Sequence, residues 1–69
     1  MWESKYYNFG VIRIEGDKVK VYYDRVNYAT VSVGQPVTNA VWAGSELNVT
    51  LANGKVRRYK DRVNYSTIG

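Results

Sequence analysis

The chain has 69 residues, neither cysteine nor histidine, and a net charge of +4. This length allows a single domain, residues 1–69, with a thin core, because a domain near this size buries only about 60% of the surface that its unfolded chain exposes. The composition excludes disulfides, ordinary zinc sites and histidine acid–base catalysis. Association with copies of itself or with another protein remains a common way for so small a domain to gain stability.

The first half of the chain predicts antiparallel β-strands. Residues 11–15 and 18–23 alternate between apolar and polar residues, and Gly16-Asp17 between them suits a tight turn, so a β-hairpin is expected. The aromatic run Tyr6–Phe9 is interpreted as a short, irregular strand. Alternation resumes over 28–33, after an irregular turn, and ends before the only proline of the chain.

The second half follows the same plan. Strands are expected over 37–43, 47–51, 56–60 and 65–68. Ala52-Asn53-Gly54 predicts a hairpin, since an Asn-Gly pair suits positive φ at both central positions of a two-residue turn. Trp42 is interpreted as a core residue. No segment has helical periodicity, so no helix longer than about one turn is expected.

A repeat connects the two halves. Residues 18–31 and 55–68 align at a constant offset of 37, and nine of the fourteen aligned positions are identical, among them the whole Asp-Arg-Val-Asn-Tyr segment. We infer a tandem duplication, with repeats at about 1–35 and 36–69. The predicted fold is all-β: a small antiparallel barrel or sandwich of two three- to four-stranded meanders related by a pseudo-twofold axis, without a substantial helix. A blade-like arrangement is the alternative.

The two repeats differ where side chains should face the core. Val21 and Tyr23 of the first repeat correspond to Arg58 and Lys60 of the second. Because an unpaired buried charge is very costly, Arg58 and Lys60 are expected at the surface. Either their strand lies at a sheet edge with a solvated face, or a bulge after Val56 exchanges the side chains that point inward.

Catalysis is not expected. The six carboxylates have no spacing typical of an acid pair or a metal site, the serines lack an identifiable base partner, and no phosphate-binding glycine motif occurs. No cofactor, metal or catalytic residue is therefore predicted. No apolar run approaches the length of a membrane span or a signal peptide, so a soluble protein without a membrane partner, cytoplasmic by default, is expected.

We therefore expect a non-catalytic module for binding or assembly, which forms a homo-oligomer or docks onto a larger complex such as a phage or virion. One alternative is a small basic β-barrel that binds single-stranded nucleic acid, because cations and an aromatic residue interleave over 57–62. Another is a carbohydrate-binding two-blade module that stacks sugars on Trp2 and Trp42 and assembles as an oligomer. The predicted binding surface comprises Arg57, Arg58, Tyr59, Lys60, Arg62 and Arg25.

Overall fold

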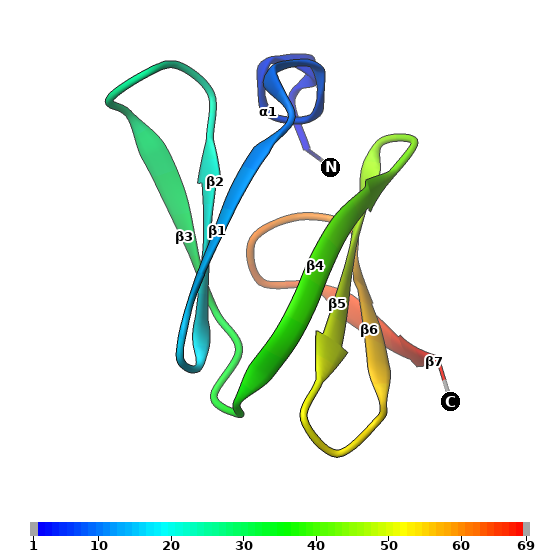
Figure 1. Ribbon diagram of the computed structural model, residues 1–69. Coiled ribbons are helices and arrows are strands. Elements are labelled where there is room, and N and C mark those ends of the chain that lie inside the picture. The colour runs from blue at the N-terminus through cyan, green and yellow to red at the C-terminus, as the bar shows by residue number, and fades with distance from the viewer. Residues whose placement is uncertain (1, 69) are drawn as a thin grey trace.

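Two antiparallel sheets form the framework of the molecule (Figure 1), and the computed structural model describes residues 2–68. The first sheet has the order β1-β2-β3 and the second the order β4-β5-β6-β7. The strands are β1 (Val11–Glu15), β2 (Lys18–Tyr22), β3 (Tyr28–Ser32), β4 (Val37–Ala43), β5 (Glu46–Leu51), β6 (Val56–Tyr59) and β7 (Tyr65–Ile68). Each sheet is a meander of neighbouring strands, which confirms the all-β antiparallel prediction.

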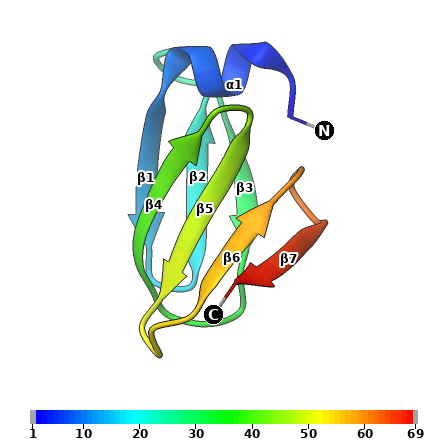
Figure 2. The same cartoon turned by 90° about the vertical axis from the view of Figure 1, so that its right-hand side faces the viewer.

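The core lies between the two sheets. Figure 2 shows the second sheet in front of the first, with β4 close to β1 and β7 at the outer margin. Alternation predicts which side chains turn inward, and the expected inward residues of β2, β3 and β5 are all buried. The largest fully buried side chains are Val19, Val21, Val31, Leu47, Val49 and Tyr59.

The helix α1 (Ser4–Phe9) replaces the strand that was expected over Tyr6–Phe9, so that prediction was wrong. A strand would point Tyr6 and Tyr7 to opposite faces, whereas a helix sets them about 100° apart. Both rings therefore reach aromatic partners: Tyr6 lies 5.2 Å from Trp2, and Tyr7 lies 5.9 Å from Trp42. Gly10, at φ 76°, ends the helix in the left-handed conformation.

The β5–β6 turn differs from the two-residue Asn-Gly turn that the sequence predicts. Leu51 N–H donates to the Lys55 carbonyl at 2.8 Å, so the loop has three residues, and among its residues only Gly54 has positive φ, at 89°. The corresponding β1–β2 turn has two residues, with Glu15 opposite Lys18. A shift of one residue turns every side chain of a strand to the other face. Consequently β6 presents to the core the face that its counterpart β2 presents to solvent.

Candidate functional site

The predicted binding surface is divided between the two faces of β6. Arg57 and Tyr59 lie on the inner face, opposite the buried residues Val49 and Leu47 of β5. Arg58 lies on the outer face, and Lys60, just after the strand, is also exposed. The expectation that Arg58 and Lys60 reach the surface is therefore confirmed, while Tyr59 is 1% exposed and cannot offer its ring to a ligand.

Arg57 connects the two sheets. Its guanidinium donates to the Val33 carbonyl at 2.9 Å and to the Tyr59 hydroxyl at 3.3 Å, and it lies 4.4 Å from the centre of the Tyr65 ring. Guanidinium groups suit this position, because they combine directed hydrogen bonds with stacking on aromatic faces. These contacts give Arg57 a structural role between the sheets.

Arg58 and Lys60 lie in mixed-charge surroundings. Arg58 forms a surface ion pair with Glu46 at 3.6 Å. Lys60 lines a shallow hollow of about 420 Å³ together with Glu46 and Asp61, so acidic groups adjoin the cation. This face offers little net attraction for an anionic ligand.

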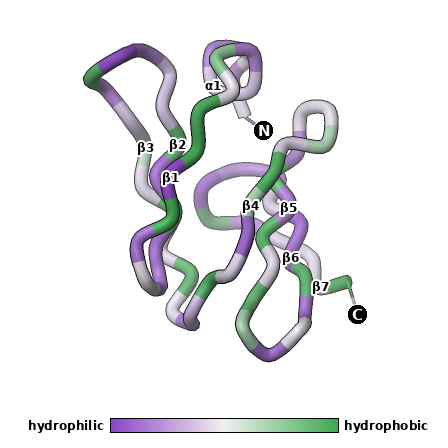
Figure 3. The backbone as a smooth tube through the Cα atoms, viewed as in Figure 1, coloured by the Kyte–Doolittle hydropathy of each residue, from purple (hydrophilic) through white to green (hydrophobic). Residues whose placement is uncertain are grey.

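The loops 24–27 and 61–64 have the same sequence and the same hydrogen bonds. Asp61 accepts from the backbone N–H groups of Val63 and Asn64 at 2.8 and 2.7 Å and from the Asn64 side chain at 2.8 Å. Asp24 accepts the equivalent three bonds within its own loop at 2.6–2.8 Å. In both loops the asparagine side-chain bond, followed by the backbone bonds, lowers the pKa of the aspartate. Figure 3 shows the two loops as mostly hydrophilic segments.

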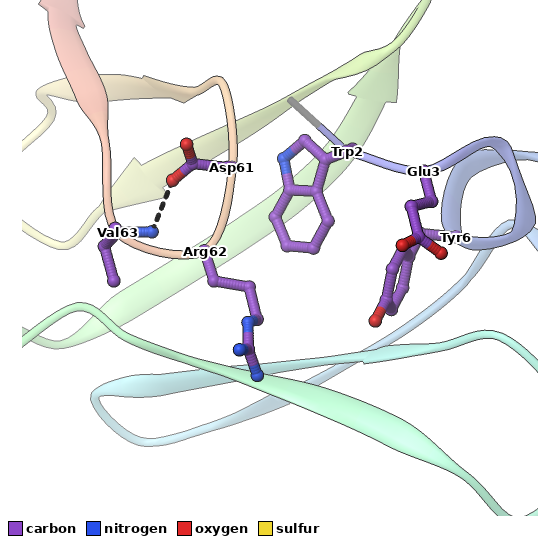
Figure 4. Close-up of a pocket in the computed structure, with 6 residues that line it drawn as sticks. All are labelled: Trp2, Glu3, Tyr6, Asp61, Arg62 and Val63. Carbon is purple, nitrogen blue, oxygen red and sulfur yellow. Dashed lines mark hydrogen bonds between the residues drawn. The ribbon is translucent and has the colours of Figure 1, made fainter.

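A cavity of about 380 Å³ separates the 61–64 loop from the N-terminal end of α1. In Figure 4, Trp2 lies between Arg62 of the loop and Tyr6 of the helix, with Glu3 and Asp61 at the two sides. Glu3 already pairs with Lys5 at 3.2 Å, and Asp61 accepts the loop hydrogen bonds. The carboxylates of this cavity are therefore engaged by the protein itself, and neither is placed as a free acid or base.

Trp2 belongs to the core, a role that the sequence analysis did not assign to it. It is 3% exposed, and its indole N–H donates to the Tyr59 carbonyl at 3.1 Å. Trp42 is half-buried and meets Trp2 edge-on at 5.3 Å. The two rings thus pack on each other, which agrees with Trp42 as a core residue and leaves Trp2 no open face on which a sugar could stack.

Arg25 lies apart from the other residues of the predicted surface. It is exposed on the loop that joins β2 to β3, and Figures 1 and 2 both place this loop away from the one that carries Arg62. Arg25 lines a separate hollow of about 550 Å³ beside Phe9, Val11 and Arg13. The arginines of the two repeats therefore do not form one site.

The edge strand β7 is unusually open. All four of its residues are exposed, including Tyr65 at 45% and Ile68 at 40%. Within residues 2–68, β7 pairs with β6 alone. By contrast, the other sheet's edge strand β3 buries Ala29 and Val31.

The described residues, 2–68, contain no group of three or more acidic side chains arranged to hold a metal ion. None of the helices in this part of the chain is long and apolar enough to cross a membrane. No protein-family model matches the chain, and no match was found among curated proteins or solved structures.

Proposed function

We propose that the protein is a non-catalytic assembly module that pairs with a second copy of itself along the open edge of β7. The observation that carries this proposal is the exposure of the whole strand, with two large apolar side chains among its four residues. A short edge strand is hydrogen-bonded to the sheet on one side. It gains stability when another strand pairs with its free side.

The backbone of β7 has two residues available for this pairing. Lys60 N–H donates to the Asn64 carbonyl at 2.9 Å, which marks 60 and 64 as a hydrogen-bonded pair. Hydrogen-bonded and non-hydrogen-bonded pairs alternate along an antiparallel ladder. With Arg58 opposite Ser66, the ladder uses the backbone groups of Ser66, and those of Tyr65 and Thr67 point away from β6.

A two-fold axis normal to the sheet allows these groups to meet. With the axis at Ser66, Tyr65 lies opposite the partner subunit's Thr67, and each such pair exchanges two backbone hydrogen bonds. The two four-stranded sheets then form one continuous sheet. Their inner faces lie on the same side, so the exposed Tyr65 rings of both copies line one shared surface.

The composition of β7 favours pairing over protection. Exposed edges are commonly guarded by charged residues or proline. Tyr65, Ser66, Thr67 and Ile68 include neither, whereas β1 carries Arg13 and Glu15. The edge strand β3 also lacks charge and proline, but it differs from β7 because Ala29 and Val31 anchor it in the core. The fourth edge strand, β4, lies beside β1.

The test replaces Thr67 by proline. Proline removes an N–H that points outward, so the β6–β7 ladder keeps its hydrogen bonds while the free edge loses a donor. Thr30→Pro is the matched control, because Thr30 is the aligned residue of the first repeat and lies at the same ladder phase on the edge of β3. Near-ultraviolet circular dichroism checks that both variants fold.

The readout is the mass in solution, measured by light scattering after size exclusion at low and high salt. We expect a dimer for the native chain and for Thr30→Pro, and a monomer for Thr67→Pro. A native chain that is monomeric at about 100 µM would overturn the proposal, and so would a Thr67→Pro variant that folds and remains dimeric.

A further inference from the structure

The outer face of the first sheet carries an aromatic row next to a basic row. The strand register aligns Val11, Tyr22 and Tyr28 across β1, β2 and β3. The next outward row consists of Arg13, Lys20 and Thr30. Val19 and Val21 point into the core between these positions, which confirms that the two rows face solvent.

The aromatic row is open to solvent. Tyr28 is 42% exposed and Val11 46%, and Phe9, at the end of α1, adds a ring that is 41% exposed. The Tyr22 and Tyr28 rings lie 5.1 Å apart. The hollow that Arg25 lines adjoins this row, and Phe9, Val11 and Tyr22 form part of its wall. A flat ring could therefore rest against aromatic side chains here.

The charge on this face is positive. Its cations are Arg13, Lys18, Lys20 and Arg25, and its carboxylates are Glu15 and Asp24. Asp24 is engaged by its own loop, and Glu15 is bound by Arg13 at 3.1 Å and by Lys20 at 3.0 Å. The four cations and two engaged carboxylates give this face a net charge of +2. Arg25 is exposed beside the rings, and Lys18 is exposed one row beyond Lys20.

We propose that this outer face binds single-stranded nucleic acid. Proteins that hold single strands combine cations for the phosphates with aromatic rings on which bases stack, and both are present here in adjacent rows. The binding would be independent of sequence, because stacking and phosphate contacts do not distinguish bases by their edges. The rows cross all three strands of the sheet, whereas a major groove admits a helix or a two-stranded ribbon, so single strands are favoured over double strands.

This surface differs from the strand and turn that the sequence singled out. The cations over 57–62 are distributed over both faces of β6, and Tyr59 is buried. On the first sheet, the two-residue turn between β1 and β2 leaves Lys20 and Tyr22 on the outer face, so that cation and rings lie on the same surface. This face belongs to the first sheet, whereas β7 belongs to the second, so nucleic-acid binding here does not depend on dimer formation.

The test is an anisotropy titration of a fluorescein-labelled oligothymidylate of 12 nucleotides with the intact protein, from 20 to 300 mM salt. For two to three contacted phosphates, log K should fall with log salt with a slope of about −1.4 to −2.1. Tyr28→Ala should weaken binding about fivefold or more, and Tyr28→Phe, which keeps the ring, should restore it.

Arg25→Ser and Arg62→Ser form a matched pair, because the two arginines occupy aligned positions in loops with the same hydrogen bonds. Arg25→Ser should reduce the salt slope by about 0.7, and Arg62→Ser should leave both slope and affinity unchanged. Equal effects of the two variants would show general charge attraction and overturn the proposal. A salt-independent signal, or no anisotropy change at about 100 µM protein in 20 mM salt, would also overturn it.

Discussion

Replacing Arg57 by methionine tests the assignment of the two faces of β6. Methionine keeps the apolar stem of the side chain but removes the guanidinium, and with it the hydrogen bonds to Val33 and Tyr59 and the contact with the Tyr65 ring. A hydrogen bond from a charged group contributes about 1.5–3 kcal/mol, and a partly exposed cation–π contact about 0.5–1 kcal/mol. Because Arg57 is only half-buried, we add the lower ends of the two ranges and expect Arg57→Met to lower the free energy of unfolding by about 2 kcal/mol.

The neighbouring residue supplies the matched control. Arg58→Met removes the same group from the outer face, where the guanidinium forms an ion pair with Glu46 at 3.6 Å. An exposed ion pair of this kind contributes about 0–1 kcal/mol, so this variant should unfold close to the native midpoint. Adjacent and chemically identical substitutions should therefore differ by about 1–2 kcal/mol, because they lie on opposite faces of one strand.

Urea unfolding followed by tryptophan fluorescence measures the difference at one fixed protein concentration, since self-association would otherwise shift the midpoint. Both variants should keep the native m-value. A loss of 2 kcal/mol is large for a chain of this size, whose total stability is on the order of 3–10 kcal/mol. Equal destabilisation by the two substitutions, or a greater effect of Arg58→Met, would refute the inward orientation of Arg57 and the register that produces it.

Two further predictions concern the loops and the core. The folded-state pKa of Asp24 and Asp61 lies below its ordinary value, so their contribution to stability is complete above about pH 4 and is lost as the pH falls further. The unfolding temperature should therefore stay level from pH 7 to 5 and decline below pH 4. In the double variant Asp24→Asn, Asp61→Asn, the unfolding temperature should decline less steeply below pH 4. The same decline in the native chain and the double variant would contradict this prediction. Trp2→Phe leaves the Tyr59 carbonyl without its indole donor and should cost about 1–3 kcal/mol in urea unfolding, whereas an unchanged midpoint would show that the bond contributes nothing.

The strands were predictable because alternation and turn residues are local signals. The predicted ranges agree with β1 to β7 to within a residue or two, and the inward residues Val31, Leu47 and Val49 are buried as expected. The helix α1 was not predictable, because six residues are too few to show helical periodicity and such a helix is marginal alone. Its stability comes from aromatic packing on Trp2 and Trp42, which a chain-order reading cannot reveal.

The candidate surface was only partly predictable. Charge alone was enough to place Arg58 and Lys60 at the surface. The inward position of Arg57 and Tyr59 depends on a turn of three residues instead of two, and Asn53-Gly54 is compatible with both lengths. The outward row on the first sheet had a usable signal, since alternation in 18–23 sets Lys20 and Tyr22 opposite the apolar face, but only the register shows that Tyr28 lies beside them.

The exchange of faces explains how one short sequence unit serves two environments. The Lys20 Nζ atom lies 4.7 Å from the centre of the Tyr28 ring. In the second repeat, the aligned Arg57 has its Cζ atom 4.4 Å from the centre of the aligned Tyr65 ring. The ring centres of Tyr22 and Tyr28 lie 5.1 Å apart, and those of the aligned pair, Tyr59 and Tyr65, lie 5.0 Å apart. The first arrangement lies on the outer face of its sheet. The second lies on the inner face, where Tyr59 is buried and Tyr65, on the edge strand, stays 45% exposed.

Tyrosine and the long cationic side chains tolerate both settings, because each has an apolar body and a polar tip. On the outer face, the arrangement leaves the Tyr28 ring 42% exposed, and Lys20 pairs with Glu15 at 3.0 Å. Between the sheets, Tyr59 is buried and the Arg57 guanidinium donates to the Val33 carbonyl. The longer turn, together with the change from Val21 and Tyr23 to Arg58 and Lys60, therefore decides which repeat holds these groups on the outer face and which one holds them between the sheets.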